Sequence, residues 1–152
     1  MKNGFMGFDL KDQTATIWDD GHGKFSCSHR RTIGATVAAI LKQPAKSKNR
    51  YVYTSSFETS QKEILASLER NTGNRWKVVS VTSDQMIAEG REGLAKGHFI
   101  SAGKLALAAS YSGKYGGDFA SMGKLANDEF GVHRESLDEI VSEILANTGS
   151  LS

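Results

Sequence analysis

The sequence predicts an α/β protein, or an α+β fold if the chain is an isolated piece, with three or four strands and about five helices. Strand-like segments alternate with helical segments along the chain, and helical segments dominate towards its end. The 152 residues are 39% hydrophobic and 24% charged, which is ordinary for a globular protein. No repeat or linker divides them, so we expect a single domain over residues 1–152.

The chain begins with an apolar, glycine-punctuated run over residues 4–10, which is typical of the middle of a domain. Such a segment needs packing partners. We therefore expect that the later chain supplies them or that the domain is incomplete.

Three segments rich in β-branched and aromatic residues predict strands at residues 14–18, 51–54 and 76–81. Aspartates and glycines over residues 19–23 predict a turn. Residues 24–26 can return from this turn, so the pattern favours an antiparallel hairpin with residues 14–18.

Helical spacing is clear in five segments. Thr32 is a candidate N-cap for a first helix that Pro44 ends, and this helix carries one apolar stripe at Ile33, Val37, Ile40 and Leu41. Ser60 and Glu63 form a capping box that opens a second helix, with Gly73 at its end. The same spacing of Thr82 and Gln85 opens a third.

Residues 101–111 predict a fourth helix, which is apolar on most faces and therefore buried. The last helix has the clearest stripe, at Leu137, Ile140, Val141, Ile144 and Leu145, with Ser136 and Glu139 at its start. This stripe fits packing within the domain or binding of a partner.

Composition argues against a nucleic-acid-binding protein, a membrane-spanning protein and a reactive cysteine. The net charge is +2 and the basic residues form no stripe, so we expect no nucleic-acid partner. No apolar run reaches about 18 residues, so we expect no membrane span and a cytoplasmic protein. Cys27 is the single cysteine, which favours a small half-buried side chain over a reactive thiol.

The chain lacks the sequence motifs of several enzyme classes. The glycine clusters follow a turn or a helix and do not form a dinucleotide or phosphate loop. No serine lies in G-x-S-x-G, and Lys114 follows Tyr111 by three positions where a reductase pair requires four. Asp19, Asp20 and His22 could hold a metal, although a solvated turn fits them better. We therefore predict no catalytic, cofactor-binding or metal-binding residue.

One aromatic loop could line a ligand pocket. Tyr115 and Phe119 flank two glycines and an aspartate after the helix that ends near Tyr111. Aromatic side chains on such loops often line apolar pockets. The alternative is that they anchor the loop to the core.

Taken together, the segments resemble fungal members of the NmrA-like, isoflavone-reductase-like family. The resemblance covers nearly the whole chain, and its specificity comes from the order of short matches: GFDLK at residue 7, TATIWDDG at 14, FS at 25, TIG at 32, AAIL at 38, NRYVY at 49, SSF at 55, Q at 61, EIL at 63, LE at 68, TG at 72, EGR at 89, LAKG at 94, YGGDF at 115 and LDE at 137.

This resemblance implies that the chain corresponds to the C-terminal, substrate-side portion of the family's proteins. Intact members are NADP(H)-binding, with an N-terminal Rossmann half that carries the glycine fingerprint and, in the reductases, a catalytic lysine beyond it. No position of this chain matches those residues. The resemblance implies that the chain supplies only the walls of a substrate pocket, and we predict that these are Phe5, Met6, Phe8, Tyr111, Tyr115 and Phe119.

Two functions follow from the resemblance. The first is the substrate-binding portion of an NADPH-dependent reductase of aromatic or other small carbonyl or alkene compounds, inactive alone. The alternative is a non-catalytic regulatory or interaction module. We also expect the isolated chain to be loosely packed or self-associating, because loss of a covering sheet exposes apolar surface.

Overall fold

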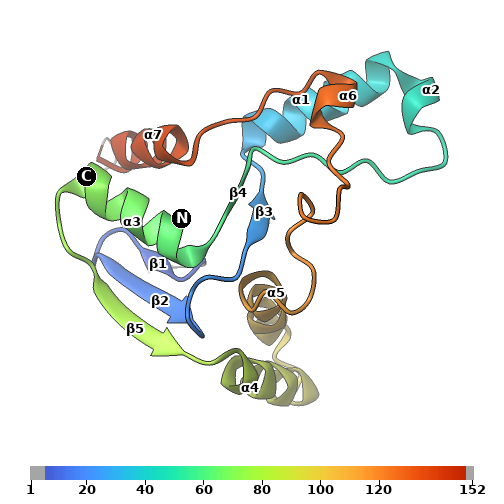
Figure 1. Ribbon diagram of the computed structural model, residues 1–152. Helices are drawn as coiled ribbons and strands as arrows, with labels where there is room; N and C mark the ends of the chain where they lie inside the picture. Colours follow the sequence, from blue (N-terminus) through green and yellow to red (C-terminus); the bar gives the residue numbers. More distant parts are fainter. Residues whose placement is uncertain (1–5, 150–152) are drawn as a thin grey trace. The chain divides into compact units, whose positions relative to one another are not determined.

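A computed structural model describes residues 6–149 (Figure 1). It confirms a mixed α/β class with few strands, and five helices of the described residues have ten or more residues. The strands are β1 (Phe8–Asp9), β2 (Thr14–Trp18), β3 (Phe25–Cys27), β4 (Phe57–Thr59) and β5 (Lys77–Val81). The helices are α1 (Arg30–Lys42), α2 (Pro44–Ser47), α3 (Gln61–Thr72), α4 (Ser83–Ala95), α5 (Ala102–Tyr111), α6 (Asn127–Phe130) and α7 (Leu137–Gly149), with a 3₁₀ turn over Phe99–Ser101.

These elements belong to two units. Unit 1 contains the described residues up to Phe25 and Ser60–Gly117, and unit 2 contains Ser26–Thr59 and the described residues from Asp118 onward. Each unit therefore combines two separate stretches of sequence.

The sheet of unit 1 has the order β1-β2-β5. Strand β1 pairs antiparallel with β2, and β2 pairs parallel with β5 from Thr14 opposite Lys77 to Trp18 opposite Val81. The predicted hairpin of residues 14–18 with residues 24–26 is wrong, because β3 pairs with β4 instead. Strand β5 has the Val-rich composition of a buried strand, yet Val78 and Val79 are 49% and 40% exposed.

Helix α3 begins and ends as predicted. Ser60 accepts a hydrogen bond from the Glu63 amide, and the Glu63 carboxylate accepts one from the Ser60 amide. Gln61, the first residue of the helix, is buried against β2, where its side chain accepts from the Trp18 amide (2.8 Å) and donates to the Thr16 carbonyl (2.9 Å). The capping box thus places a polar side chain that satisfies the backbone of the central strand.

Gly73 ends α3 in the left-handed conformation, with φ +69° and open space around an added Cβ. We expect Gly73→Ala to lower the free energy of unfolding by about 1 kcal/mol, because an alanine Cβ is disfavoured at this backbone angle. Gly73→Asn should cost less, since asparagine tolerates the conformation. Urea unfolding would measure both. Gly103→Ala, a control inside α5, should not destabilise, and equal losses at the two glycines would contradict the conformational cause.

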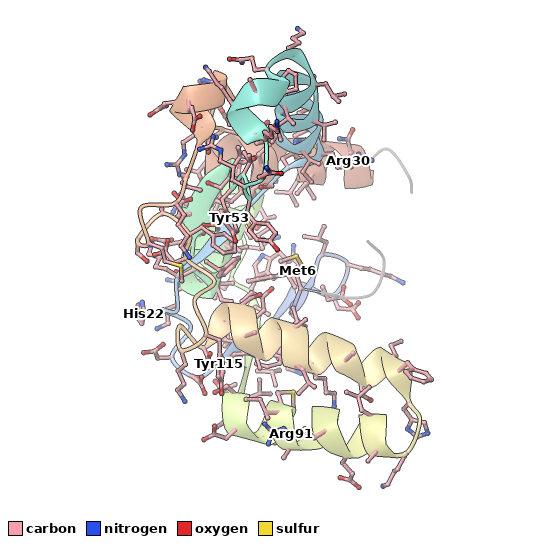
Figure 2. All side chains as sticks on the ribbon, turned by 90° about the vertical axis from the view of Figure 1, so that its right-hand side faces the viewer. Met6, His22, Arg30, Tyr53, Arg91 and Tyr115 are labelled. Carbon is pink, nitrogen blue, oxygen red and sulfur yellow. The ribbon has the colours of Figure 1, made fainter. Side chains whose placement is uncertain are left out.

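Helices α4 and α5 of unit 1 lie side by side (Figure 2). An added Cβ on Gly90 would lie 2.8 Å from a Leu105 side-chain atom, and one on Gly93 would lie 2.1 Å from the Ser101 hydroxyl. The two glycines therefore allow close helix packing. Helix α5 is less buried than predicted, because Ala108 and Tyr111 are its buried residues while Ala102 and Ala106 are exposed.

Unit 2 has a smaller apolar core and a buried polar network. Ile140 and Val141 of α7 pack inside, as the predicted stripe requires, together with Phe130 and Val132. The predicted strand at residues 51–54 is reduced to a single bridge from Tyr53 to Leu125. Asn127 is buried and bonds the backbone of Ser55 in both directions, at 3.1 and 2.9 Å.

Candidate functional site

Tyr111, a predicted pocket residue, lies in the core of unit 1. Its ring packs edge-on against Trp18, with centroids 6.0 Å apart, and lies 5.0 Å from Phe25. Its hydroxyl donates to the carbonyl of Met6 at 3.0 Å. The structure thus brings together two of the five predicted pocket residues that it describes, Met6 and Tyr111. These contacts give Tyr111 a packing role, and a role in ligand binding stays a prediction.

Phe8 and Tyr115, the other described pocket residues of unit 1, do not share the contact between Tyr111 and Met6. Phe8 of β1 packs edge-on against Trp76, with ring centroids 6.4 Å apart. Tyr115 is largely exposed in the loop after α5 (Figure 2). Phe5 lies outside the described residues.

Phe119 belongs to unit 2, where it contacts an aromatic residue that the sequence prediction missed. Its ring lies 4.8 Å from that of Tyr53, and its amide donates to the Ser26 hydroxyl at 3.0 Å. The ammonium of Lys124 lies 5.9 Å from the Tyr53 ring centroid. The spacing of Tyr51 and Tyr53 could have identified Tyr53 as a candidate, because two aromatic residues two positions apart in an extended segment lie on the same side of it.

Unit 1 also has an open groove of about 490 Å³ between α3 and the β2–β5 pair, and none of the predicted pocket residues that the structure describes lines it. It extends from Val78, near the amino end of β5, to Asp19 and Asp20, just beyond the carboxyl end of β2. Ligands of α/β sheets commonly bind at the carboxyl ends of strands. Apolar and charged side chains both line it: Ile17, Asp19, Asp20, Lys62, Leu65, Ala66, Glu69, Val78 and Ser80.

The carboxylates of this groove already have partners. Asp19 accepts from the Ser83 amide at 2.8 Å, at the start of α4, and this hydrogen bond lowers the pKa of the Asp19 carboxyl below its usual value. Asp20 accepts from the His22 amide, and Glu69 from the Trp76 amide. Lys62 is the one basic residue among these lining residues, and it has no ion pair with a described residue. Within residues 6–149, no group of three His, Cys, Asp or Glu residues is arranged to hold a metal.

A second polar centre lies in unit 2 around Glu135. One carboxylate oxygen accepts from the hydroxyls of Thr32 (2.6 Å) and Ser56 (2.8 Å), and the other accepts from the Arg31 guanidinium. These hydrogen bonds, Thr32 first, hold the pKa of the Glu135 carboxyl at about 2. His29 Nδ1 lies 3.5 Å from the same carboxylate. Glu135 therefore places a negative charge beside the start of α1.

This centre explains a wrong N-cap prediction. Helix α1 begins at Arg30 with His29 as its N-cap, so Thr32 lies inside the helix. The Thr32 hydroxyl points into the unit, where it donates to Glu135 and lies 2.7 Å from the Ser56 hydroxyl. Sequence spacing could not show this, because Glu135 is 103 positions away from Thr32.

Cys27 lies close to this region and is half-buried. Burial, and then the charge of Glu58, raise the pKa of its thiol to about 11. The thiol is therefore protonated at neutral pH, which favours the small packing side chain over a reactive thiolate.

Comparison with known proteins relates the chain to oxidoreductases. It is 32% identical to the oxidoreductase aprR of Aspergillus flavus over 141 residues, which are 93% of this chain and 48% of that protein. It is 31% identical to the oxidoreductase poxI of Penicillium oxalicum over 142 residues, which are 92% of this chain and 45% of that protein. The chain thus spans about half the length of the curated relatives it matches. No protein-family model matches it.

These findings support the oxidoreductase part of the resemblance. The narrower NmrA-like assignment stays a prediction. Among the helices of residues 6–149, none combines the length and apolar character that crossing a membrane requires.

Proposed function

We propose that the chain is the substrate-binding portion of an NmrA-like reductase that uses NADPH on aromatic or other small carbonyl or alkene substrates. The observation that carries the proposal is the similarity over more than nine tenths of the chain to two proteins named oxidoreductases. In this proposal a dinucleotide-binding half supplies NADP(H) and the hydride chemistry, and the present chain supplies pocket walls.

The parallel pairing of β2 with β5 supports this proposal. Parallel neighbours require a crossover connection and are typical of α/β folds. Helix α3 lies between these strands in sequence.

A chimera tests the proposal. This chain would replace the aligned region of the Aspergillus flavus relative, and NADPH fluorescence and turnover of aromatic carbonyl and enone compounds would be measured. We expect saturable NADPH binding and reduction by the chimera, but no saturable binding by the 152-residue chain alone. Micromolar NADPH binding by the chain alone would contradict the assignment of the cofactor site to the other half.

Two substitutions in this chimera test the predicted pocket. Tyr115→Ala and Phe119→Ala should each raise KM about tenfold while changing kcat less, since both would remove binding surface and no reacting group. Met122→Ala, another partly exposed side chain in the loop after α5, is the control. Unchanged KM in both variants would remove these residues from the pocket.

A second candidate is a non-catalytic interaction module. The specific observation in its favour is an apolar stripe of α1 that faces solvent.

A further inference from the structure

Helix α1 turns its apolar stripe outward and its threonines inward. Ile33, Val37 and Leu41 are 52%, 52% and 74% exposed, whereas Thr32 and Thr36 are buried. Each buried threonine has a hydrogen-bond partner: Thr32 donates to Glu135, and Thr36 bonds the Thr54 hydroxyl at 2.7 Å. The polar network of unit 2 thus fixes the rotation of the helix, and the stripe has no cover among the described residues.

The rest of this outer face is also apolar and small. Gly34, Ala35 and Ala38 are exposed beside the stripe, and an added Cβ on Gly34 would meet no atom within 4 Å. Surface helices of globular proteins normally place charged and polar residues on the outer face. Small residues next to branched ones form a surface into which the ridge of a second helix can pack closely.

The stretch of sequence that contains α1 carries charge of one sign. Residues 26–57 contain six Lys or Arg residues and no Asp or Glu. Arg31, Lys46 and Arg50 are already bonded to groups of unit 2, Arg31 to Glu135 and Glu143, and the other two to Glu129. Arg30 and Lys42, at the two ends of α1, have no ion pair with a described residue. They lie about 18 Å apart along the axis of the helix.

We propose that this face of α1 docks an acidic amphipathic helix of a partner protein. Its apolar side chains would pack on Ile33, Val37 and Leu41, and carboxylates near its two ends would meet Arg30 and Lys42. A second copy of α1 fits poorly, because its own Arg30 and Lys42 would repeat the same charge. A lipid surface fits less well, because the stripe has none of the aromatic side chains that interfacial helices use. The proposal does not depend on reductase activity.

The test uses a labelled synthetic helix of about 18 residues with leucines along one face and glutamates at both ends. Fluorescence anisotropy should show saturable binding to the 152-residue chain. Val37→Asp should weaken binding about tenfold or more, since it places a charge in the centre of the contact. Ile100→Asp is the matched control, because Ile100 is 92% exposed in unit 1 and its replacement should leave binding unchanged. Circular dichroism would establish that both variants are folded.

A charge exchange adds a second readout. The double variant Arg30→Glu, Lys42→Glu should lose affinity for the glutamate-flanked helix and gain affinity for the same helix flanked by lysines. Equal binding of both peptides to the unchanged chain, or an unchanged affinity in Val37→Asp, would overturn the proposal. It would also fail if the chain ignored the peptide but bound phosphatidylserine vesicles, or if sedimentation showed a dimer that Val37→Asp abolished.

Discussion

Replacing Gly23 by alanine should lower the free energy of unfolding of unit 1 by about 3 kcal/mol. An added Cβ at this position would lie 2.0 Å from the Tyr111 carbonyl oxygen and 2.9 Å from the Gly113 amide nitrogen. Both are backbone atoms, so no side-chain rotation relieves the overlap. The chain around Tyr111 would have to move, although this tyrosine packs against Trp18 and Phe25 in the core.

Urea unfolding followed by tryptophan fluorescence would measure this effect, because Trp18 and Trp76 both lie in unit 1. The control is Gly103→Ala, where the added Cβ meets no atom within 4 Å and the glycine lies within α5 of unit 1. It should stabilise its helix by about 0.5–1 kcal/mol. A Gly23→Ala variant as stable as the unchanged chain would refute the close approach of these two backbone segments.

Replacing Glu135 by glutamine should lower the free energy of unfolding of unit 2 by about 2–3 kcal/mol. The substitution keeps the shape of the side chain but removes the charge that strengthens its bonds to Thr32, Ser56 and Arg31. It also places an amide NH₂ where an acceptor is needed. Hydrogen exchange of the α1 amides would follow unit 2 directly.

Glu135 should also make unit 2 sensitive to acid. The pKa of its carboxyl falls from 4.5 to about 2 on folding, so the stabilisation is present above pH 4.5 and is lost as the pH falls towards 2. Glu135→Gln should reduce this dependence. Glu92→Gln is the control, because its exposed pair with Lys96 contributes little. If both variants showed the same acid profile, the charge at Glu135 would not be the cause.

Elements whose bounds depend on neighbouring residues in the sequence were predicted correctly. The capping box at Ser60 and the terminal Gly73 predicted the bounds of α3. β-branched residues predicted strands at residues 14–18 and 76–81, and the second begins one residue later, at Lys77. The partners of the strands were not predictable in this way. The turn at residues 19–23 suggested a hairpin, but β2 finds its parallel partner some 60 residues later in the chain.

The α1 face, the Tyr53–Phe119 pair and the polar centre around Glu135 were harder to predict, because each depends on contacts between residues that are distant in the sequence. Periodicity correctly found the stripe of α1 but could not say which face is buried, and the bonds of Thr32 and Thr36 decided it. Tyr53 was assigned to a strand, so its contact with Phe119 was missed. No sequence pattern indicated that Glu135 accepts hydrogen bonds from Thr32 and Ser56.

The interleaving of the two units limits how this chain can be divided. The backbone passes between them three times, after Phe25, Thr59 and Gly117. A fragment that ends at Thr59 would keep α1 but lack Glu135, the carboxylate at its start. Deletion from either end therefore cannot isolate one unit, and a free-standing version of unit 1 requires a new covalent connection from Phe25 directly to Ser60.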